Sequence, residues 1–238
     1  MTETIVCFGD SLTEGVIGAA YVDVLRERLP GARVINAGIN GDTTINLLRR
    51  IDRDVVPHRP DRVIVLVGMN DLGTAYGQRL NKTYYRTFKR VDVELTPARF
   101  VQSYRQLIAA LRQRTGARLA LCTLTTLSER PGHSSHTLVD AYSTVVRALA
   151  LQEGLDLIDV RAAFEAAIAQ EPRDGPAYRL WLPLVDALRV RLGRGQIDSI
   201  GAARGYRLLC DGVHLSSAGA GIVAASILDY LGVYDSRQ

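Results

Sequence analysis

Short apolar runs recur along the chain, and they do not alternate with polar residues. They are rich in Val, Ile and Leu, as in IVCF near the N-terminus and VIVLV further on. Such runs are typical of strands covered on both faces, because an exposed face would place a polar residue at every second position. The pattern therefore predicts five buried strands: Thr4–Phe8, Arg33–Asn36, Arg62–Val67, Ala117–Thr123 and Leu155–Val160.

Helical periodicity fills the segments between these runs. In Pro97–Thr115 the apolar residues recur at three- and four-residue spacing, and Pro97 suits the first turn of a helix. Similar patterns predict four further helices: Ala19–Leu29, Thr43–Val55, His136–Gln152 and Ser217–Leu231. Strands that alternate with helices over short connections predict an α/β fold with a doubly wound parallel sheet. Ligands of such sheets bind beyond the carboxyl ends of the strands.

Two long segments interrupt this alternation, Leu72–Leu95 and Glu171–Leu209. The first carries the basic stretch NKTYYRTFKR, and the second carries the single tryptophan, Trp181. Connections of this length are often lids or binding loops. The alternative is surface decoration with a short helix of its own. We predict one domain over residues 1–238, with inserts at about 72–95 and 171–209.

Composition and charge restrict the class of protein. The 238 residues are 47% hydrophobic and 23% charged, as in a globular protein with a large core. The net charge of +4 comes without a long basic stripe interleaved with aromatic residues, so we expect no nucleic-acid partner. No apolar stretch approaches the roughly 18 residues of a membrane span. The chain as given has no signal-peptide pattern, and we expect a cytoplasmic protein.

The three cysteines are far apart and lack the Cys/His spacing of a metal site. Cys7 and Cys122 lie in apolar runs, and we expect both to be small buried hydrophobic residues. The role of Cys210 stays open, because it directly precedes the polar stretch DGVHLS.

One apolar run ends in a motif that raises the question of catalysis. The stretch CFGDSLTEG puts Ser11 just beyond the carboxyl end of the first predicted strand. Asp and Ser are also common in turns, where their side chains bond the local backbone. Serine becomes a useful nucleophile only when a base removes its proton and donors stabilise the oxyanion. A catalytic Ser11 therefore requires a base and donors at the same edge of the sheet.

The candidate base is His214, in the stretch CDGVHLSSAGAG before the last predicted helix. Asp211 stands three residues upstream. A tight turn of that length can bring a carboxylate to the far nitrogen of the imidazole ring, where it orients the ring and supports its charged form. The alternative is an aspartate that caps a turn and a histidine on the surface.

Candidate donors follow two further predicted strands. Gly41 lies in NAGINGDTT, a loop that leads into a helix and lets an oxygen approach the backbone N–H closely. Asn70, in VGMNDLG, is an uncharged side-chain donor suited to polarising a carbonyl group. Each stretch alone is also compatible with an ordinary turn. Their combination on one predicted rim favours catalysis.

The stretches FGDSLTEG, NAGINGDTT, VGMND and DGVHLS resemble, in order and separation, the sequence blocks of the SGNH (GDSL) hydrolase family. The resemblance spans nearly the whole chain. It implies a three-layer α/β/α sandwich with a flavodoxin-like sheet of five parallel strands, and a serine ester hydrolase without a metal or organic cofactor. It implies Ser11 as nucleophile, His214 as general base and Asp211 as its orienting partner. It also implies an oxyanion hole made by the backbone N–H groups of Ser11 and Gly41 and the side chain of Asn70.

The other polar candidates have simpler interpretations. Asp10 is expected to hold its loop by hydrogen bonds, and His58 is expected in a surface loop. His133 and His136 flank a predicted helix start, where caps or rim contacts are expected. Four basic residues of the first insert are expected to form a solvated face: Lys82, Arg86, Lys89 and Arg90.

The substrate stays open beyond a small-molecule ester. The basic insert favours anionic esters if it faces the site, whereas Tyr84, Tyr85 and Trp181 would suit a sugar or an acyl chain. If these aromatic residues close over the site and exclude water, the same serine would pass its acyl group to a hydroxyl or amine acceptor. A binding module without turnover is a third hypothesis, and the presence of all five predicted site residues argues against it.

Overall fold

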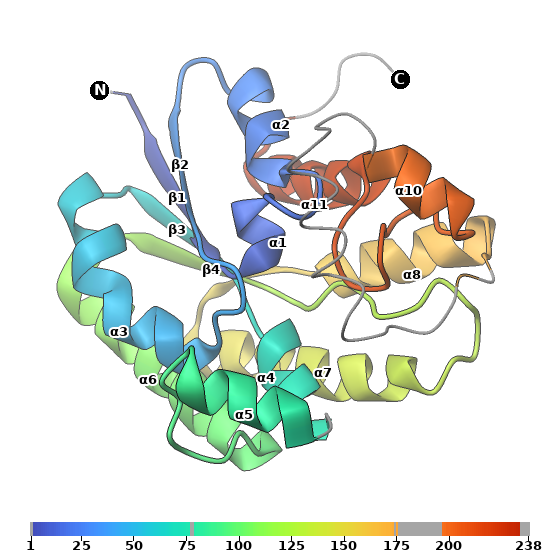
Figure 1. The fold of residues 1–238 in the computed structure, drawn as a ribbon. Helices are drawn as coiled ribbons and strands as arrows, with labels where there is room; N and C mark the ends of the chain where they lie inside the picture. The colour runs from blue at the N-terminus through green and yellow to red at the C-terminus, as the bar shows by residue number, and fades with distance from the viewer. Residues whose placement is uncertain (1, 77–78, 174, 176–196, 234–238) are drawn as a thin grey trace.

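The computed structural model describes residues 2–76, 79–173, 175 and 197–233. Its centre is a sheet of five parallel strands in the order β2-β1-β3-β4-β5 (Figure 1). The strands are β1 (Thr4–Gly9), β2 (Arg33–Gly38), β3 (Arg62–Leu66), β4 (Arg118–Cys122) and β5 (Asp156–Ile158). This order is that of flavodoxin-like sheets. The predicted α/β fold with five parallel strands is confirmed.

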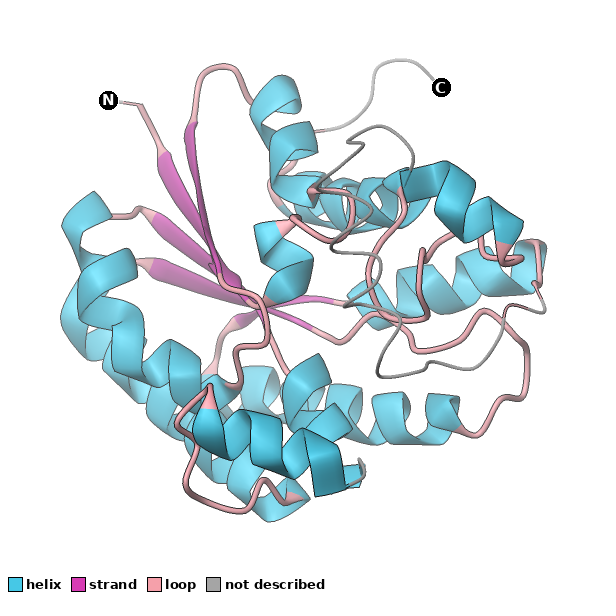
Figure 2. Cartoon of the chain, in the orientation of Figure 1, coloured by secondary structure: helices cyan, strands magenta, loops and turns pink. Residues whose placement is uncertain are grey.

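Helices cover both faces of the sheet, which gives three layers (Figure 2). One face carries α2 (Tyr21–Arg28), α8 (Val160–Gln170) and α11 (Ser217–Tyr230). The other face carries α3 (Thr44–Asp54), α6 (Pro97–Thr115) and α7 (Ser135–Glu153). The other helical elements of the described residues are α1 (Ser11–Glu14), η1 (Val56–His58), α4 (Met69–Tyr76), α5 (Arg79–Thr87) and α10 (Ile197–Ala203).

Helix α6 shows why the periodic segments fold where they were predicted. The Thr96 side chain accepts a hydrogen bond from the N–H of Arg99, and Pro97 occupies the first turn. Gly116, at φ +67°, ends the helix in the left-handed conformation that glycine adopts readily. Between these ends, the predicted apolar face is buried, including Phe100, Tyr104 and Leu107.

The predicted elements depart from the structure in two places, the last strand and the helix that follows it. The strand predicted over Leu155–Val160 is shorter, because Asp159 caps α8 through the N–H of Ala162 and Val160 is already helical. Helix α8 itself was not predicted. Asn70, predicted at the carboxyl edge of the third strand, lies in the first turn of α4, which follows β3.

The structure describes the two inserts to different extents. The first, 72–95, is mostly helical, since it contains the rest of α4 and the whole of α5. Much of the second, 171–209, lies outside the described residues, and its described part contains α10.

The buried cysteines belong to the apolar core between the layers. Cys7 and Cys122 are fully buried in β1 and β4, as predicted, and Cys210 is buried as well. Burial raises the pKa of the Cys7 thiol to about 12, which keeps it protonated and unreactive. Among the helices of the described residues, none is both long and apolar enough to cross a membrane.

Candidate active site

Ser11 is the first residue of α1, directly beyond the carboxyl end of β1. Its side chain is only 7% exposed. The Asp10 carboxylate caps this short helix by accepting from the N–H of Leu12 at 3.0 Å. Asp10 therefore holds the loop by hydrogen bonds, as predicted.

Gly9 lets α1 cross the end of the sheet. A Cβ atom at this position would lie 2.2 Å from the Thr13 hydroxyl oxygen and 2.4 Å from the Leu66 carbonyl oxygen. No larger side chain fits there without moving α1 or β3. The glycine of the GDS motif thus serves the close packing that positions Ser11.

His214 reaches Ser11 from a tight loop that precedes α11. The loop is closed by an antiparallel bridge between Leu209 and Leu215, and by a hydrogen bond from the Cys210 N–H to the His214 carbonyl at 2.9 Å. His214 Nε2 lies 3.1 Å from Ser11 Oγ. This is hydrogen-bonding distance, so the imidazole can accept the hydroxyl proton.

Asp211 holds the other side of the imidazole. Its Oδ2 lies 2.6 Å from His214 Nδ1, and its Oδ1 accepts from the N–H groups of Val213 and His214 at 3.0 and 2.8 Å. Burial alone would raise the pKa of Asp211. The His214 ring and these two N–H groups outweigh burial and lower the pKa, so the carboxylate stays ionised. Ser11, His214 and Asp211 thus form a continuous chain of hydrogen-bonding contacts, called the relay below.

A buried carboxylate supports the loop that carries Asp211 and His214. Glu129, between β4 and α7, accepts from the backbone N–H groups of Arg207, Leu208 and Leu209 at 2.8 to 3.1 Å. These residues lead directly into the loop. The sequence offered no signal for Glu129, because its three partners are backbone groups about 80 positions away.

Asn70 connects the Ser11 segment to the Gly41 loop. Its side-chain Nδ2 donates to the Asp42 carbonyl at 2.9 Å and lies 3.3 Å from Asp10 Oδ2. Gly41 precedes Asp42 in the loop after β2 and has φ +74°, a value that favours glycine. The predicted donors therefore lie on the same rim as the relay.

A buried ionic cluster holds the Gly41 loop in place. Arg50 of α3 contacts Asp42 Oδ2 at 2.7 Å, and Lys89 contacts Asp42 Oδ1 at 2.9 Å. Arg50 also donates to the carbonyl oxygens of Gly9 and Ala37, at the ends of β1 and β2. No sequence pattern distinguished Arg50 from the other arginines of its helix, because its role depends on where α3 packs.

The sequence profile of the GDSL-like lipase/acylhydrolase family matches residues 7–222 of this chain, which is most of its length. The chain belongs to the GDSL-like lipase/acylhydrolase family. It is a carboxylic ester hydrolase, and the resemblance seen in four sequence blocks is confirmed.

Relatives of this GDSL-like hydrolase include characterised esterases. An acetylxylan esterase of Geobacillus stearothermophilus is 26% identical over 184 residues, which cover 70% of this chain and 80% of that protein. LAE5, an alpha/beta hydrolase enzyme from the metagenome of Lake Arreo, Spain, has a similar structure, with a TM-score of 0.68, 20% identity, and coverage of 98% of this chain and 97% of that one. The acetyl xylan esterase AlAXEase gives a TM-score of 0.66 and 24% identity, over 96% of this chain and 99% of that one. At these identities the structural likeness shows the fold.

The Geobacillus esterase has also been solved as catalytic mutants in which a serine, an aspartate or a histidine is replaced by alanine. The aspartate of that esterase precedes its histidine by three positions. Asp211 precedes His214 by the same spacing in this chain.

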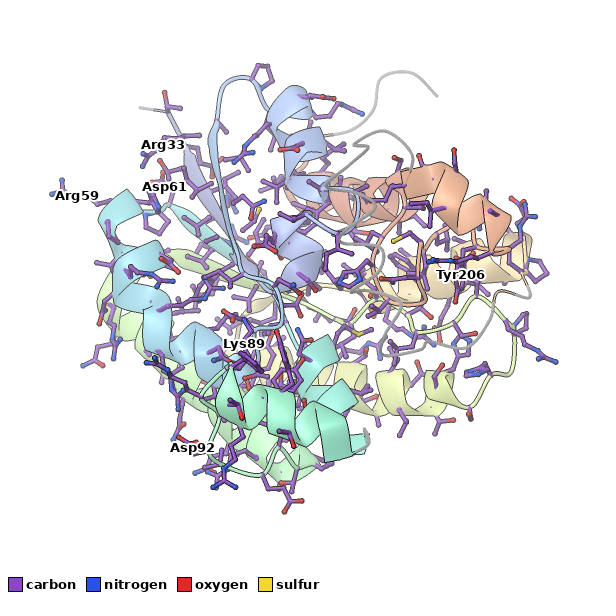
Figure 3. The ribbon with its side chains drawn as sticks, viewed as in Figure 1. Arg33, Arg59, Asp61, Lys89, Asp92 and Tyr206 are labelled. Carbon is purple, nitrogen blue, oxygen red and sulfur yellow. The ribbon has the colours of Figure 1, made fainter. Side chains whose placement is uncertain are left out.

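The remaining histidines of the GDSL-like hydrolase have contacts away from the relay. His58 is half-buried in η1, next to Arg59, which Figure 3 shows at the amino ends of the strands, far from Lys89. His133 Nδ1 bonds the hydroxyl and N–H of Ser135 at the start of α7, as predicted for a cap. His136 bonds the buried guanidinium of Arg161 at 2.8 Å.

The basic residues of the first insert differ from the prediction of one solvated face. Arg86 and Arg90 are exposed, as predicted. For Lys89 the prediction is wrong, because its ammonium group binds Asp42 and the Asn40 carbonyl where the loop after β2 meets α5 (Figure 3). The side chain of Lys82 and the whole of Trp181 lie outside the described residues.

A hollow of about 320 Å³ lies beside Tyr85. It is lined by residues of α4, α5 and the segment that follows: Thr74, Tyr85, Arg86, Val91, Asp92, Val93, Glu94 and Leu95. None of the five predicted site residues lines it. Within the part of the chain that the structure describes, no group of three or more His, Cys, Asp or Glu side chains is arranged to hold a metal ion.

Proposed function

We propose that this protein is a serine ester hydrolase that forms a covalent acyl-enzyme on Ser11. The observation that carries the proposal is the relay itself, with 3.1 Å between Ser11 Oγ and His214 Nε2 and 2.6 Å between His214 Nδ1 and Asp211 Oδ2. A serine, a base and an orienting carboxylate in this sequence match the requirements of nucleophilic acyl transfer.

The reaction proceeds in two stages. Ser11 Oγ attacks the ester carbonyl carbon while His214 accepts the hydroxyl proton, and ionised Asp211 stabilises the imidazolium. His214 then protonates the leaving alcohol as the tetrahedral intermediate collapses to the acyl-enzyme. Water, deprotonated by His214, attacks the acyl-enzyme carbonyl, and the acid leaves as Ser11 recovers its proton.

The oxyanion of each stage is assigned to three donors: the backbone N–H groups of Ser11 and Gly41 and the Asn70 side chain. The Asn70 Nδ2 already has two acceptors, of which Asp10 is the more distant at 3.3 Å. We expect the substrate oxygen to replace this weaker contact. Loss of the Asn70 amide should lower kcat by about 100- to 1,000-fold.

The nucleophile is tested by Ser11→Ala, which should lower kcat for p-nitrophenyl acetate by at least about 1,000-fold without changing Tm by more than a few degrees. A fluorophosphonate should label the wild-type protein at Ser11 and leave the variant unlabelled, as read by mass spectrometry. Ser226→Ala, on the distant face of α11, is the matched control with normal turnover. Normal turnover of Ser11→Ala would exclude this mechanism.

The orienting role is tested by Asp211→Asn. Asparagine keeps the size of the side chain but loses the charge that supports the imidazolium, so kcat should fall by about 100- to 10,000-fold. Asp23→Asn, at an exposed position of α2, should leave kcat unchanged. Equal turnover of the two variants would remove Asp211 from the relay.

For the substrate we propose a short-chain acyl group, such as acetyl, on a carbohydrate hydroxyl. The acetylxylan esterase relatives support this class. The exposed rings of Tyr84 and Phe88 also support it, because aromatic faces stack on sugars and the Tyr84 hydroxyl lies close to Gly41.

The substrate proposal is tested with acetylated xylo-oligosaccharides and with p-nitrophenyl esters of two, four and eight acyl carbons. We expect kcat/KM to be highest for acetyl esters. A preference for the eight-carbon ester, or for an anionic ester over its neutral counterpart, would contradict it.

The transferase alternative predicts acylated products when xylose or glycerol is added, and hydrolysis alone argues against it.

A further inference from the structure

Helix α5 meets the Asn70 side chain through Tyr85. The Tyr85 hydroxyl donates to Asn70 Oδ1 at 2.6 Å, while Asn70 Nδ2 donates to the Asp42 carbonyl at 2.9 Å. The Tyr85 side chain is buried between α5 and α4. None of these contacts uses a residue of the relay.

The Asp42 carbonyl selects one orientation of the Asn70 amide, and the Tyr85 hydroxyl holds the oxygen end of the amide in that orientation. If the amide were flipped, its oxygen would face the Asp42 carbonyl oxygen, and two acceptors would meet without a proton. In the observed orientation the NH₂ group faces the Asp42 and Asp10 side, which is the side of Gly41 and Ser11. A hydrogen bond to the amide oxygen also polarises the amide and strengthens its N–H groups as donors.

Lys89, two residues after α5, binds the residues on both sides of Gly41. Its ammonium group donates to the Asn40 carbonyl and to Asp42 Oδ1. The Lys89 carbonyl accepts from the Asn46 side chain at 2.9 Å, which ties this segment to the start of α3. The Gly41 backbone is therefore confined between the segment after α5 and the ionic cluster around Asp42.

We propose that Tyr85 and Lys89 are positioning residues of the oxyanion hole: Tyr85 orients the Asn70 amide, and Lys89 fixes the Gly41 N–H. This inference rests on the proposed function, in which Asn70 and Gly41 stabilise the oxyanion. It gives the first insert a defined role in the chemistry. Neither residue needs to touch the substrate, so both act through the donors that they hold.

A double-mutant cycle separates positioning from packing. Tyr85→Phe removes one hydroxyl and keeps the ring, and it should lower kcat for p-nitrophenyl acetate about 10-fold with little change in KM. In an Asn70→Ala background the same substitution should have no further effect, because the amide that it orients is gone. Tyr230→Phe, which removes a hydroxyl bonded to Asp156 far from the site, should leave kcat at the wild-type value.

Lys89→Met provides an independent test through the second donor. It removes the ammonium group and keeps much of the stem, while Asp42 retains its ion pair with Arg50, and it should lower kcat about 10-fold with little change in KM. Arg86→Met, at an exposed position of α5, is the matched control with normal kcat.

The outcomes distinguish this inference from the proposed function. If Asn70→Ala lowers kcat but Tyr85→Phe and Lys89→Met do not, the positioning roles are overturned and the oxyanion hole stands. If Tyr85→Phe lowers kcat by the same factor in the wild-type and the Asn70→Ala backgrounds, the role of Tyr85 is also overturned. If Asn70→Ala itself has normal kcat, the donor assignment fails and the role of Tyr85 fails with it.

Discussion

Asp10 and Asp211 are both fully buried carboxyl groups near the proposed nucleophile, yet their pKa values shift in opposite directions. Asp211 has an imidazole partner and two backbone N–H groups, which together outweigh the cost of burial. Burial raises the pKa of Asp10 to about 7, and the Leu12 N–H and the more distant His214 offset only part of this shift. The same residue type therefore serves as an ionised partner at one position and as a group that titrates near neutrality at the other.

The raised pKa of Asp10 predicts a pH-dependent stability. Because the folded state favours the protonated form, the contribution of Asp10 to stability is fully present below about pH 4 and is lost as the pH rises through about 7. The asparagine of Asp10→Asn cannot ionise. The Tm of this variant relative to that of the wild type should therefore rise by about 5 °C or more between pH 4 and pH 8. If the substitution also lowers stability by an amount that does not depend on pH, the Tm of the variant is lower at every pH and its trend with pH is unchanged.

Asp54→Asn is the control with the opposite sign. The hydrogen bond from Arg53 is the main cause of the lowered pKa of Asp54. The stability that Asp54 contributes is therefore lost as the pH falls below the ordinary pKa of an aspartate. The variant should therefore be most destabilised at neutral pH and approach the wild type in acid. A Tm difference between wild type and Asp10→Asn that stays constant from pH 4 to pH 8 would contradict the raised pKa of Asp10.

At the scale of elements, α1 depends on its close approach to the sheet. Gly9→Ala would force a methyl group against Thr13 and the Leu66 carbonyl, and overpacking of this kind costs about 1–3 kcal/mol. We expect Tm to fall by about 3–10 °C and kcat to fall at least 10-fold, because Ser11 moves with α1. Gly31→Ala adds the same methyl group where no atom lies within 4 Å, and it should change neither value appreciably. Equal effects of the two substitutions would refute this account of α1.

The elements also differ in how far the sequence predicts them. Helix α6 has a polar cap, an early proline, a periodic apolar face and a final glycine, all within its own segment. Helix α4 has Asn, Asp and Gly near its start, which are turn residues by local preference. The segment is nevertheless helical. The Asp71 carboxylate accepts hydrogen bonds from the N–H and the hydroxyl of Thr44, and only the packed structure brings these residues together.

At the scale of the whole molecule, Arg50 joins parts of the rim that are distant in sequence. Its buried guanidinium donates to the Gly9 and Ala37 carbonyls and to the carboxylates of Asp42 and Asp54. It thereby links the ends of β1 and β2 to the loop that carries Gly41. We propose that the chain forms one domain around this rim, as the extent of the family match supports.

Arg50→Lys tests this link. Lysine keeps the charge but cannot reach all four acceptors with the geometry of a guanidinium, which leaves buried oxygens without donors. A buried oxygen left without a donor costs about 1–3 kcal/mol, so we expect Tm to fall by about 3–10 °C together with a loss of esterase activity. Arg53→Lys, with a side chain that is 68% exposed, should melt within about 2 °C of the wild type. A wild-type Tm for Arg50→Lys would rule out a structural role for Arg50.

The sequence by itself determined the α/β architecture, the five parallel strands and the family, because apolar periodicity and short motif blocks are local properties of the chain. It also indicated Ser11, Gly41, Asn70, Asp211 and His214, because each follows a strand or precedes a helix at the edge where such sheets bind ligands. Only the tertiary structure decided how these residues are supported. Arg50, Glu129, Tyr85 and Lys89 make contacts with residues 15 to 80 positions away, and the direction of a buried side chain depends on how helices pack, which no local pattern encodes.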